Sequence, residues 1–210
     1  MSEYIQLDVE CTFKNVVEVV YAERVRRTQE KKQQFIIAGS YASYLYFSRY
    51  QDFNLNLIFN DVDVYFGEFV DYNEDTSMLN KPSLVSQEKI HDTSLDKPLN
   101  FVKMRNLSLI GLIRTFDINA ISVGFKCIIN ESGKLQQVEW HTDTAFDDFA
   151  EDEKHFLKLR NDSWLSLRPS CFIRLIHKHK QLKLPLLVPL HTNPEKTCKI
   201  FNSSNIYIYI

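Results

Sequence analysis

Hydrophobic residues recur at two different spacings along the chain, and each spacing predicts a different backbone conformation. Residues 13–33 repeat apolar positions every three or four residues with charged residues between them, which is typical of an amphipathic helix. A short apolar run at 35–38 predicts a strand that ends at Gly39-Ser40, and residues 41–50 return to helical spacing. The N-terminal part therefore predicts the order helix, strand, Gly-Ser, helix.

The clearest alternation lies at residues 61–69, DVDVYFGEF. Apolar Val62 and Val64 alternate with polar Asp61 and Asp63 there. A period of two places successive side chains on opposite faces of a strand, so this segment predicts one apolar and one polar face.

A polar stretch follows at residues 71–98, with two prolines and little periodicity. We expect it to be an excursion that is only partly ordered. An extended segment is expected to resume at 99–104, and a short helical turn at about 107–114.

The longest extended pattern covers residues 116–129, FDINAISVGFKCII. A continuous strand would place Asp117, Asn119 and Ile121 on one face. A turn-forming NESGK sequence then separates this strand from a hairpin partner at 135–140.

The C-terminal third predicts two more helices and a short tail. Thr144 is expected to cap a helix over 145–153, followed by a short extended segment at 155–160. Pro169 suits the first turn of a basic helix. The β-prone tail at 202–210 is a candidate to pair with an edge strand.

These elements predict an α+β protein with a mixed sheet flanked by helices and a basic helix near the C-terminus. No internal repeat or clear linker is visible, so we expect one domain over residues 1–210, with a core at about 13–165 and a C-terminal helix and tail at 166–210.

Composition fits a cytoplasmic globular protein. Hydrophobic residues make up 44% and charged residues 25% of the 210 positions, and no apolar run approaches the roughly 20 residues that cross a bilayer. The N-terminus lacks a basic region followed by an apolar stretch, so no signal peptide and no membrane partner are expected. The four cysteines are scattered without zinc-ligand spacing, which indicates free thiols.

The charge is distributed unevenly. Residues 1–153 hold 15 Lys and Arg against 25 Asp and Glu, whereas residues 154–210 hold 10 against 2, giving net charges of −10 and +8. A basic C-terminal segment could hold a polyanion such as a triphosphate or RNA. Mutual attraction of the two segments explains the asymmetry equally well.

Three aspartates are candidates for metal-dependent chemistry. Asp61 and Asp63 must point to one face of their strand, and Asp117 begins another predicted strand. Carboxylate oxygens can hold two Mg²⁺ ions about 4 Å apart, as transfer of a phosphoryl-type group requires. Gly39-Ser40 precedes a helix whose free N–H groups could receive phosphate oxygens. The structural alternatives are the solvated face of an edge strand and a simple helix start.

In this order, Ile37-Ala38-Gly39-Ser40, Asp61-Val62-Asp63-Val64 and Phe116-Asp117-Ile118-Asn119 resemble the signature of the DNA-polymerase-β-like nucleotidyltransferase superfamily, including its viral and phage members. The resemblance covers about residues 35–130. It implies that Asp61 and Asp63 bind metal, and that Asp117 binds metal and helps activate an acceptor hydroxyl. It also implies transfer of a nucleotidyl group from a nucleoside triphosphate with release of pyrophosphate.

One departure from the family pattern is the spacing between the motifs. Twenty residues separate Ser40 from Asp61, about twice the usual number, and a longer helix or inserted loop would have to accommodate them. Farther along, Arg174 and Lys178 lie one turn apart on the basic helix and are candidates for contact with phosphate or RNA, although a solvated helix face is the competing interpretation.

The sequence thus predicts a nucleotidyltransferase that depends on Mg²⁺ or Mn²⁺ and uses a nucleoside triphosphate such as ATP. Its acceptor could be RNA, a protein or a small molecule, and the basic helix favours RNA slightly. The alternative is a catalytically inactive relative that serves as a binding or regulatory module.

Overall fold

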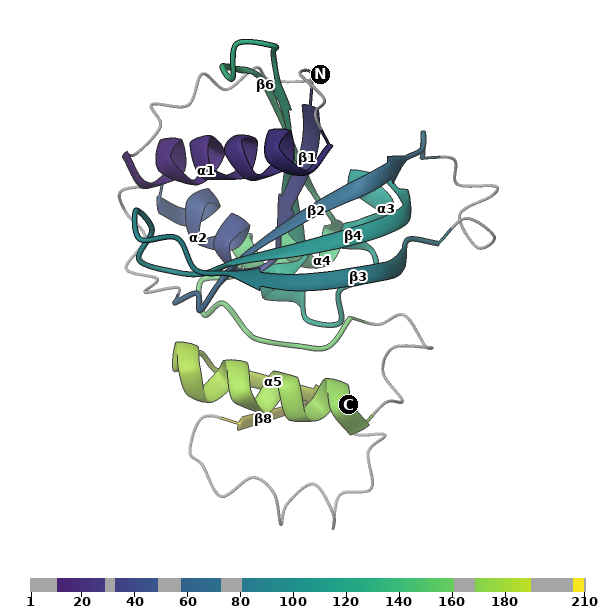
Figure 1. Cartoon of the computed structure of the whole chain (residues 1–210). Helices are drawn as coiled ribbons and strands as arrows, with labels where there is room; N and C mark the ends of the chain where they lie inside the picture. Colours follow the sequence, from purple (N-terminus) through teal and green to yellow (C-terminus); the bar gives the residue numbers. More distant parts are fainter. Residues whose placement is uncertain are drawn as a thin grey trace.

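A mixed α+β fold is built on one six-stranded sheet (Figure 1). The computed structural model describes residues 11–28, 33–48, 58–72, 81–160, 169–189 and 206–209. The sheet strands are β1 (Gln33–Ala38), β2 (Val62–Phe69), β3 (Ser83–Ile90), β4 (Leu99–Leu107), β5 (Val123–Ile129) and β6 (Leu135–Thr142). The helices are α1 (Cys11–Thr28), α2 (Ser40–Ser48), α3 (Leu109–Ile113), α4 (Thr144–Glu151) and α5 (Pro169–Leu182), with a 3₁₀ turn, η1, at Asn119–Ile121.

The strand order is β3-β4-β2-β1-β5-β6. Strand β2 pairs in parallel with β4, and the other neighbours in this sheet are antiparallel. The β2–β4 register places Asp63 beside Asn100, and the β1–β2 register places Ile37 beside Val64. Paired residues share a face, so Asp63 and Asn100 lie next to each other on the face opposite Val64.

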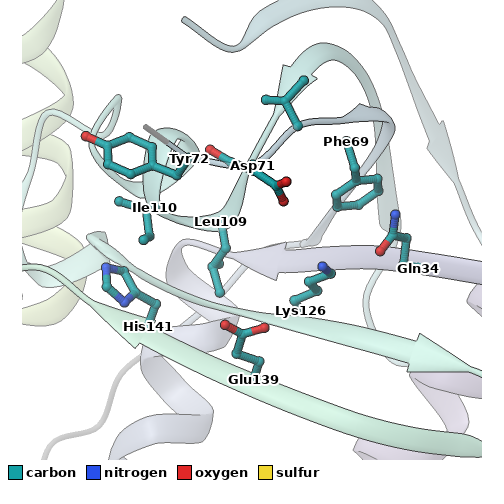
Figure 2. Close-up of a pocket in the computed structure, with 11 residues that line it drawn as sticks. Gln34, Phe69, Asp71, Tyr72, Leu109, Ile110, Lys126, Glu139 and His141 are labelled. Atoms are coloured by element: carbon teal, nitrogen blue, oxygen red, sulfur yellow. The ribbon is translucent and has the colours of Figure 1, made fainter. Parts of the chain in front are cut away.

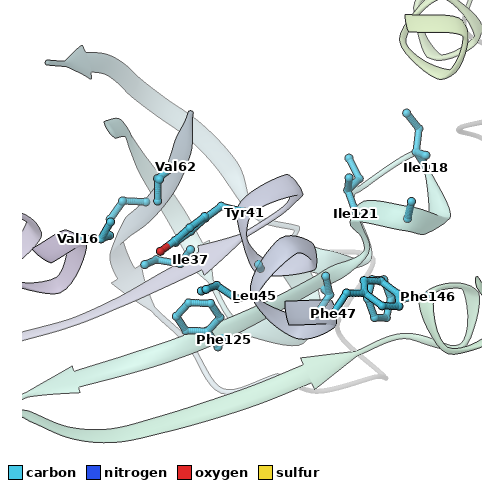
Figure 3. Packing of buried hydrophobic residues seen from close by; sticks show 14 of the residues in the cluster. Val16, Ile37, Tyr41, Leu45, Phe47, Val62, Ile118, Ile121, Phe125 and Phe146 are labelled. Atoms are coloured by element: carbon cyan, nitrogen blue, oxygen red, sulfur yellow. The ribbon is translucent and has the colours of Figure 1, made fainter. Parts of the chain in front are cut away.

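The two faces of the sheet are covered unequally. Helices α1 and α2 lie together on one face (Figure 1), where Phe13, Tyr41 and Phe125 belong to a large apolar cluster. Figure 3 shows how side chains of α2, β1 and β5 meet there. The other face carries a smaller cluster, in which α3 packs through Leu112 against Ile36 and its neighbours.

Most predicted elements are confirmed, but the long strand expected at 116–129 is wrong. Only Val123–Ile129 is a strand, and Asn119–Ile121 forms the 3₁₀ turn. The Asn119 side chain donates to the carbonyl of Phe156 and accepts from the N–H of Lys158. These bonds anchor the turn to a later segment and interrupt the extended backbone, so Asp117 and Asn119 do not share a strand face.

The region 71–98, expected to be a partly ordered excursion, contains a strand that the sequence pattern did not locate, β3. All but the last residue of this strand are exposed, and it forms an edge of the sheet. A strand with solvent on both faces needs no alternation of apolar and polar residues, which explains the missing pattern.

The C-terminal elements bring two smaller corrections. Asp143, and not Thr144, caps α4, because its side chain accepts from the N–H of Phe146. The strand β8 (Ile206–Tyr209) pairs in parallel with β7 (Leu186–Pro189) in a separate two-stranded sheet rather than with an edge of the main sheet. Among the described helices, none has the length and apolar character needed to cross a bilayer.

Candidate functional site

The turn between β1 and α2 presents its backbone directly over a carboxylate. Gly39 has a φ of +87°, a left-handed conformation that glycine adopts without the steric cost of a side chain. Its N–H donates to the carbonyl of Val123, and Ser43 donates back to its carbonyl, which fixes the turn at the helix start. A Cβ at Gly39 would lie 3.6 Å from Oδ2 of Asp63. The glycine turn and this carboxylate therefore form one site.

Asp61 and Asp63 lie at the beginning of β2 and belong to one electrostatic environment, as the alternating pattern predicts. Asp63 accepts a hydrogen bond of 2.5 Å from Nδ2 of Asn100 on β4. Asp61 forms an ion pair of 2.9 Å with Lys89 on β3. Side chains of β4 and β3, the two strands beyond β2 in the sheet, thus hold Asp63 and Asp61 respectively.

Asp63 has a strongly perturbed acidity. Its pKa is raised from 3.8 to about 6, and burial is the largest cause. The hydrogen bond from Asn100 and the charges of Lys89 and Lys178 lower the pKa, whereas the charge of Asp61 raises it. Burial disfavours the charged form of a carboxyl group. A divalent cation would compensate for the missing solvation of this ionised carboxylate.

Helix α5 brings two basic side chains to the same end of the sheet. Lys178 donates to Oγ of Ser40 at 2.8 Å, and Arg174 donates to Oδ2 of Asp117 at 3.0 Å. Burial lowers the pKa of Lys178, and the negative charges of Asp61 and Asp63 oppose that shift. Helix α5, which the sequence predicts to be basic, therefore faces both the aspartates and the Gly39-Ser40 turn.

Asp117 lies between α3 and η1, with its side chain 3% exposed. Arg174 occupies Oδ2, and Oδ1 has no hydrogen-bond partner within the part of the chain that the structure describes. The thiol of Cys171 lies against this carboxylate, and burial followed by the proximity of Asp117 raises the pKa of that thiol. Asp117 thus contacts side chains of α5 and is not grouped with Asp61 and Asp63.

The three aspartates predicted from the sequence are not gathered into one cluster. In the described ranges, no three His, Cys, Asp or Glu side chains lie close enough together to hold a metal ion. Asp61 and Asp63 come together, and Arg174 stands at Asp117. Lys178 interacts electrostatically with Asp61, Asp63 and Arg174, so it links the two parts of the site.

Three polar residues of the site escaped the sequence reasoning: Gln87, Lys89 and Asn100. Gln87 and Lys89 lie in the segment that lacked periodicity, and Asn100 stands at a buried position between apolar neighbours. A polar residue inside the apolar sequence Leu99-Asn100-Phe101 is the one signal that could have indicated Asn100. Its partner depends on strand register, which the sequence pattern did not provide.

A hollow lies beside the first residues of α3, lined by Leu109 and Ile110 of that helix among others (Figure 2). Its volume is about 400 Å³, and its lining includes Lys126, Glu139 and His141. Lys126 Nζ stands 5.5 Å from the centre of the Phe69 ring. None of the site residues predicted from the sequence lines this hollow.

The donor set at β2 suits Mg²⁺ or Mn²⁺. These hard cations prefer oxygen ligands, and Mg²⁺ is commonly held by one or two carboxylates together with waters and substrate phosphates. Asp61 and Asp63 supply two carboxylates, and the Gly39 turn lies beside Oδ2 of Asp63. The site therefore fits a metal that binds jointly with a nucleotide.

The solved structures that resemble this chain include two enzymes. One is a tRNA-processing enzyme in an apo form, with 13% identity and a TM-score of 0.46, covering 86% of this chain and 45% of that chain. The other is a CCA-adding enzyme in complex with CTP, with 11% identity and a TM-score of 0.48, covering 91% of this chain and 42% of that one. The chain therefore spans less than half the length of either. No family model and no curated protein matches its sequence.

Proposed function

We propose that this chain is a metal-dependent nucleotidyltransferase that binds the triphosphate of a nucleotide between the Gly39 turn and α5. The observation that carries the proposal is the position of Gly39, whose missing Cβ would lie 3.6 Å from Oδ2 of Asp63. Backbone N–H groups at a helix N-terminus donate hydrogen bonds to phosphate oxygens. A carboxylate beside them can hold the metal that those phosphates require.

Each group has a defined task in this proposal. The backbone N–H of Ser40 and the ammonium of Lys178 would bind phosphate oxygens, and Gly39, which lacks a side chain, would let the phosphate approach the turn. Asp61 and Asp63 would hold Mg²⁺ or Mn²⁺ beside them. The bound metal stabilises negative charge that develops on the transferring phosphoryl group. The protein itself contributes orientation, because β2, α2 and α5 fix the carboxylates, the turn and the basic side chains relative to each other.

Asp117 has a conditional place in the proposal. Arg174 holds its Oδ2, so Asp117 completes the metal set only when Arg174 turns to a phosphate oxygen. A triphosphate, with several negative charges, competes with a single carboxylate for that guanidinium. Nucleotide binding would then release the third carboxylate, which acts as a metal ligand and as a base for the acceptor hydroxyl.

For the acceptor we favour RNA. The C-terminal segment 154–210 has a net charge of +8, and Arg174 and Lys178 stand at the site. Basic side chains beside a triphosphate-binding site suit an acceptor with a phosphate backbone.

The proposal is tested by transfer of label from each α-³²P nucleoside triphosphate to RNA, protein or small acceptors in the presence of Mg²⁺ or Mn²⁺. We expect incorporation by the wild type and none by Asp61→Ala/Asp63→Ala. Glu131→Ala, in the exposed turn between β5 and β6, serves as the matched control and should retain activity. Transfer that persists in the double variant would refute the assignment of the carboxylates.

An inactive module that only binds a nucleotide is the second candidate. It is favoured by the ion pair between Arg174 and Asp117, which leaves no cluster of three metal ligands among the described residues. In that case an NTP with Mg²⁺ would raise the melting temperature of the wild type but not of the double variant, and label would reach no acceptor.

A further inference from the structure

Asn100 stands in the middle of a polar row that crosses three strands. The strand registers place Asp63 of β2 beside Asn100 of β4, and Asn100 beside Lys89 of β3. Residues paired in this way lie on one face of the sheet. Asn100 is 6% exposed, so its amide is a buried polar group that needs partners.

Both ends of the Asn100 amide are used, and the partners determine its orientation. Nε2 of Gln87 donates to Oδ1 of Asn100 at 2.8 Å, and Nδ2 of Asn100 donates to Oδ1 of Asp63 at 2.5 Å. Because an ionised carboxylate can only accept, the amino end of Asn100 must face Asp63. The carbonyl end then faces β3, where the amino group of Gln87 donates to it.

This orientation leaves the two oxygens of Asp63 in different situations. Oδ1 is bound by the amide of Asn100, whereas Oδ2 is the atom nearest to the Cβ position above Gly39. The free oxygen therefore points toward the turn at the start of α2. A metal held there would lie between the carboxylate and a phosphate on that turn.

An amide is well suited to this task because it donates without carrying charge. Asp61 is held by the ammonium of Lys89, which offsets its negative charge. Asn100 orients Asp63 and leaves the whole negative charge of that carboxylate for a cation. Groups that orient a metal ligand typically change metal affinity by 10- to 100-fold when removed.

We propose that Asn100, whose carbonyl end is held by Gln87, is a positioning residue that fixes Asp63 with Oδ2 directed to the nucleotide-bound metal. The inference rests on the proposed function, since it assigns a role within the same site. It adds a relay of hydrogen bonds from Gln87 on β3 through Asn100 on β4 to Asp63 on β2, in which Gln87 acts on the carboxylate only through Asn100.

The central test measures Mn²⁺ affinity by electron paramagnetic resonance, with and without a non-hydrolysable nucleoside triphosphate. We expect Asn100→Leu to lower the affinity about tenfold. Gln87→Glu should lower it as much, because a carboxylate at position 87 demands the amino end of Asn100 and turns its carbonyl toward Asp63. Ser86→Glu adds the same charge on the exposed neighbouring residue and should have little effect.

A double-variant cycle separates the relay from a general loss of packing. Gln87→Leu should weaken Mn²⁺ binding in the wild-type background and have no further effect in Asn100→Leu, since coupled residues are not additive. Urea unfolding shows whether each variant is folded. Independent effects of the two substitutions, or equal effects of Gln87→Glu and Ser86→Glu, would overturn the proposal.

A spectroscopic measurement keeps this inference distinct from the proposed function. The ¹⁵N–¹H₂ resonances of Asn100 should report a hydrogen bond to Asp63 in the wild type and should shift in Gln87→Glu, because the amino group then donates to the new carboxylate on β3. If that change occurs while the wild type binds no Mn²⁺, the proposed function fails and the orienting relay stands. If the resonances of Asn100 do not respond to Gln87→Glu, the relay is wrong whatever the metal affinity is.

Discussion

The two faces of the sheet differ in what covers them and in what they leave exposed to chemistry. On the face under α1 and α2, aromatic and branched side chains from five or more elements pack into one large cluster. On the other face, the short helix α3 belongs to a smaller apolar cluster, and polar residues of β2, β4 and β3 form contacts of their own. The first face supplies most of the apolar burial, and the second leaves Asp61 and Asp63 accessible to ligands.

This division explains how a carboxylate with an unfavourable environment can persist. Asp63 is poorly solvated and lies near Asp61, which costs stability when both are ionised. The opposite face of the same strand, with Val62 and Val64, is fully packed. Burial of Val62 and Val64 offsets the electrostatic cost of the two carboxylates. One face of β2 therefore stabilises the fold, and the other carries the candidate metal ligands.

The largest expected effect concerns the large cluster. Phe125 is completely buried and stands 5.4 Å from the ring of Phe13 and 4.5 Å from that of Trp140. Phe125→Ala should lower the free energy of unfolding by about 3–5 kcal/mol, measured by urea denaturation. Leu112→Ala, in the smaller cluster, should cost about 2–3 kcal/mol. An equal or larger loss for Leu112→Ala would contradict the unequal roles of the two faces.

The second prediction is that Asp63→Asn stabilises the protein while it removes metal binding. Between pH 3.8 and about 6 the folded state keeps a proton that the unfolded state has released, so stability falls as pH rises through this window. Above it the whole penalty is present, at most about 3 kcal/mol for a shift of this size.

Urea unfolding at pH 4.5 and 7.5, without metal, checks this pH dependence. Asp63→Asn should be more stable than the wild type at pH 7.5, with a smaller difference at pH 4.5. Glu131→Gln, which makes the same change of charge in an exposed turn, is the control. A wild type that is at least as stable as Asp63→Asn at pH 7.5 would show that Asp63 is not under electrostatic strain.

The third prediction separates backbone strain from phosphate binding. Gly39→Ala should lower stability by about 1–2 kcal/mol, because a side chain is disfavoured at a φ of +87°. Gly133→Ala, at a φ of +80° in the turn between β5 and β6, imposes similar backbone strain away from the site, and its Cβ would also stand 2.8 Å from the Tyr21 ring, so its loss of stability should be at least as large. Only Gly39→Ala should weaken binding of a fluorescent nucleoside triphosphate. Equal loss of nucleotide affinity in both variants would indicate a general effect of instability.

The smallest expected effect tests the exchange of Arg174 between Asp117 and phosphate. Arg174→Gln should weaken nucleotide binding about tenfold, equivalent to about 1.4 kcal/mol, and should strengthen Mn²⁺ binding in the absence of nucleotide. Lys178→Met should also weaken nucleotide binding, but it leaves Asp117 paired with Arg174. Isothermal titration measures both affinities. Weaker Mn²⁺ binding by Arg174→Gln would show that the ion pair does not restrain the third carboxylate.

The periodicity of the chain correctly located its strongest elements. Helical spacing placed α1, α2 and α5, and strict alternation placed β2 with both carboxylates on one face. These are local properties, since the helical and extended periods follow from backbone geometry alone. The motif at Gly39-Ser40 was likewise readable, because glycine before a helix has a local physical reason.

The failures occurred where distant partners decide the conformation. The strand expected through Asp117 is broken by hydrogen bonds from Asn119 to residues almost forty positions later. The strand β3 exists because β4 pairs with it, and its exposed residues carry no apolar pattern. Sequence spacing contains neither kind of information, since both depend on register between separate segments.

For the candidate site, the sequence alone determined the pair Asp61 and Asp63, the glycine turn at 39 and a basic helix with Arg174 and Lys178. The tertiary structure decided which of these meet: Lys178 at Ser40, Arg174 at Asp117, and Asn100 at Asp63. The physical reason is that the helical or strand period determines on which face of its own element a side chain lies. Strand pairing and helix packing determine which other element that face contacts.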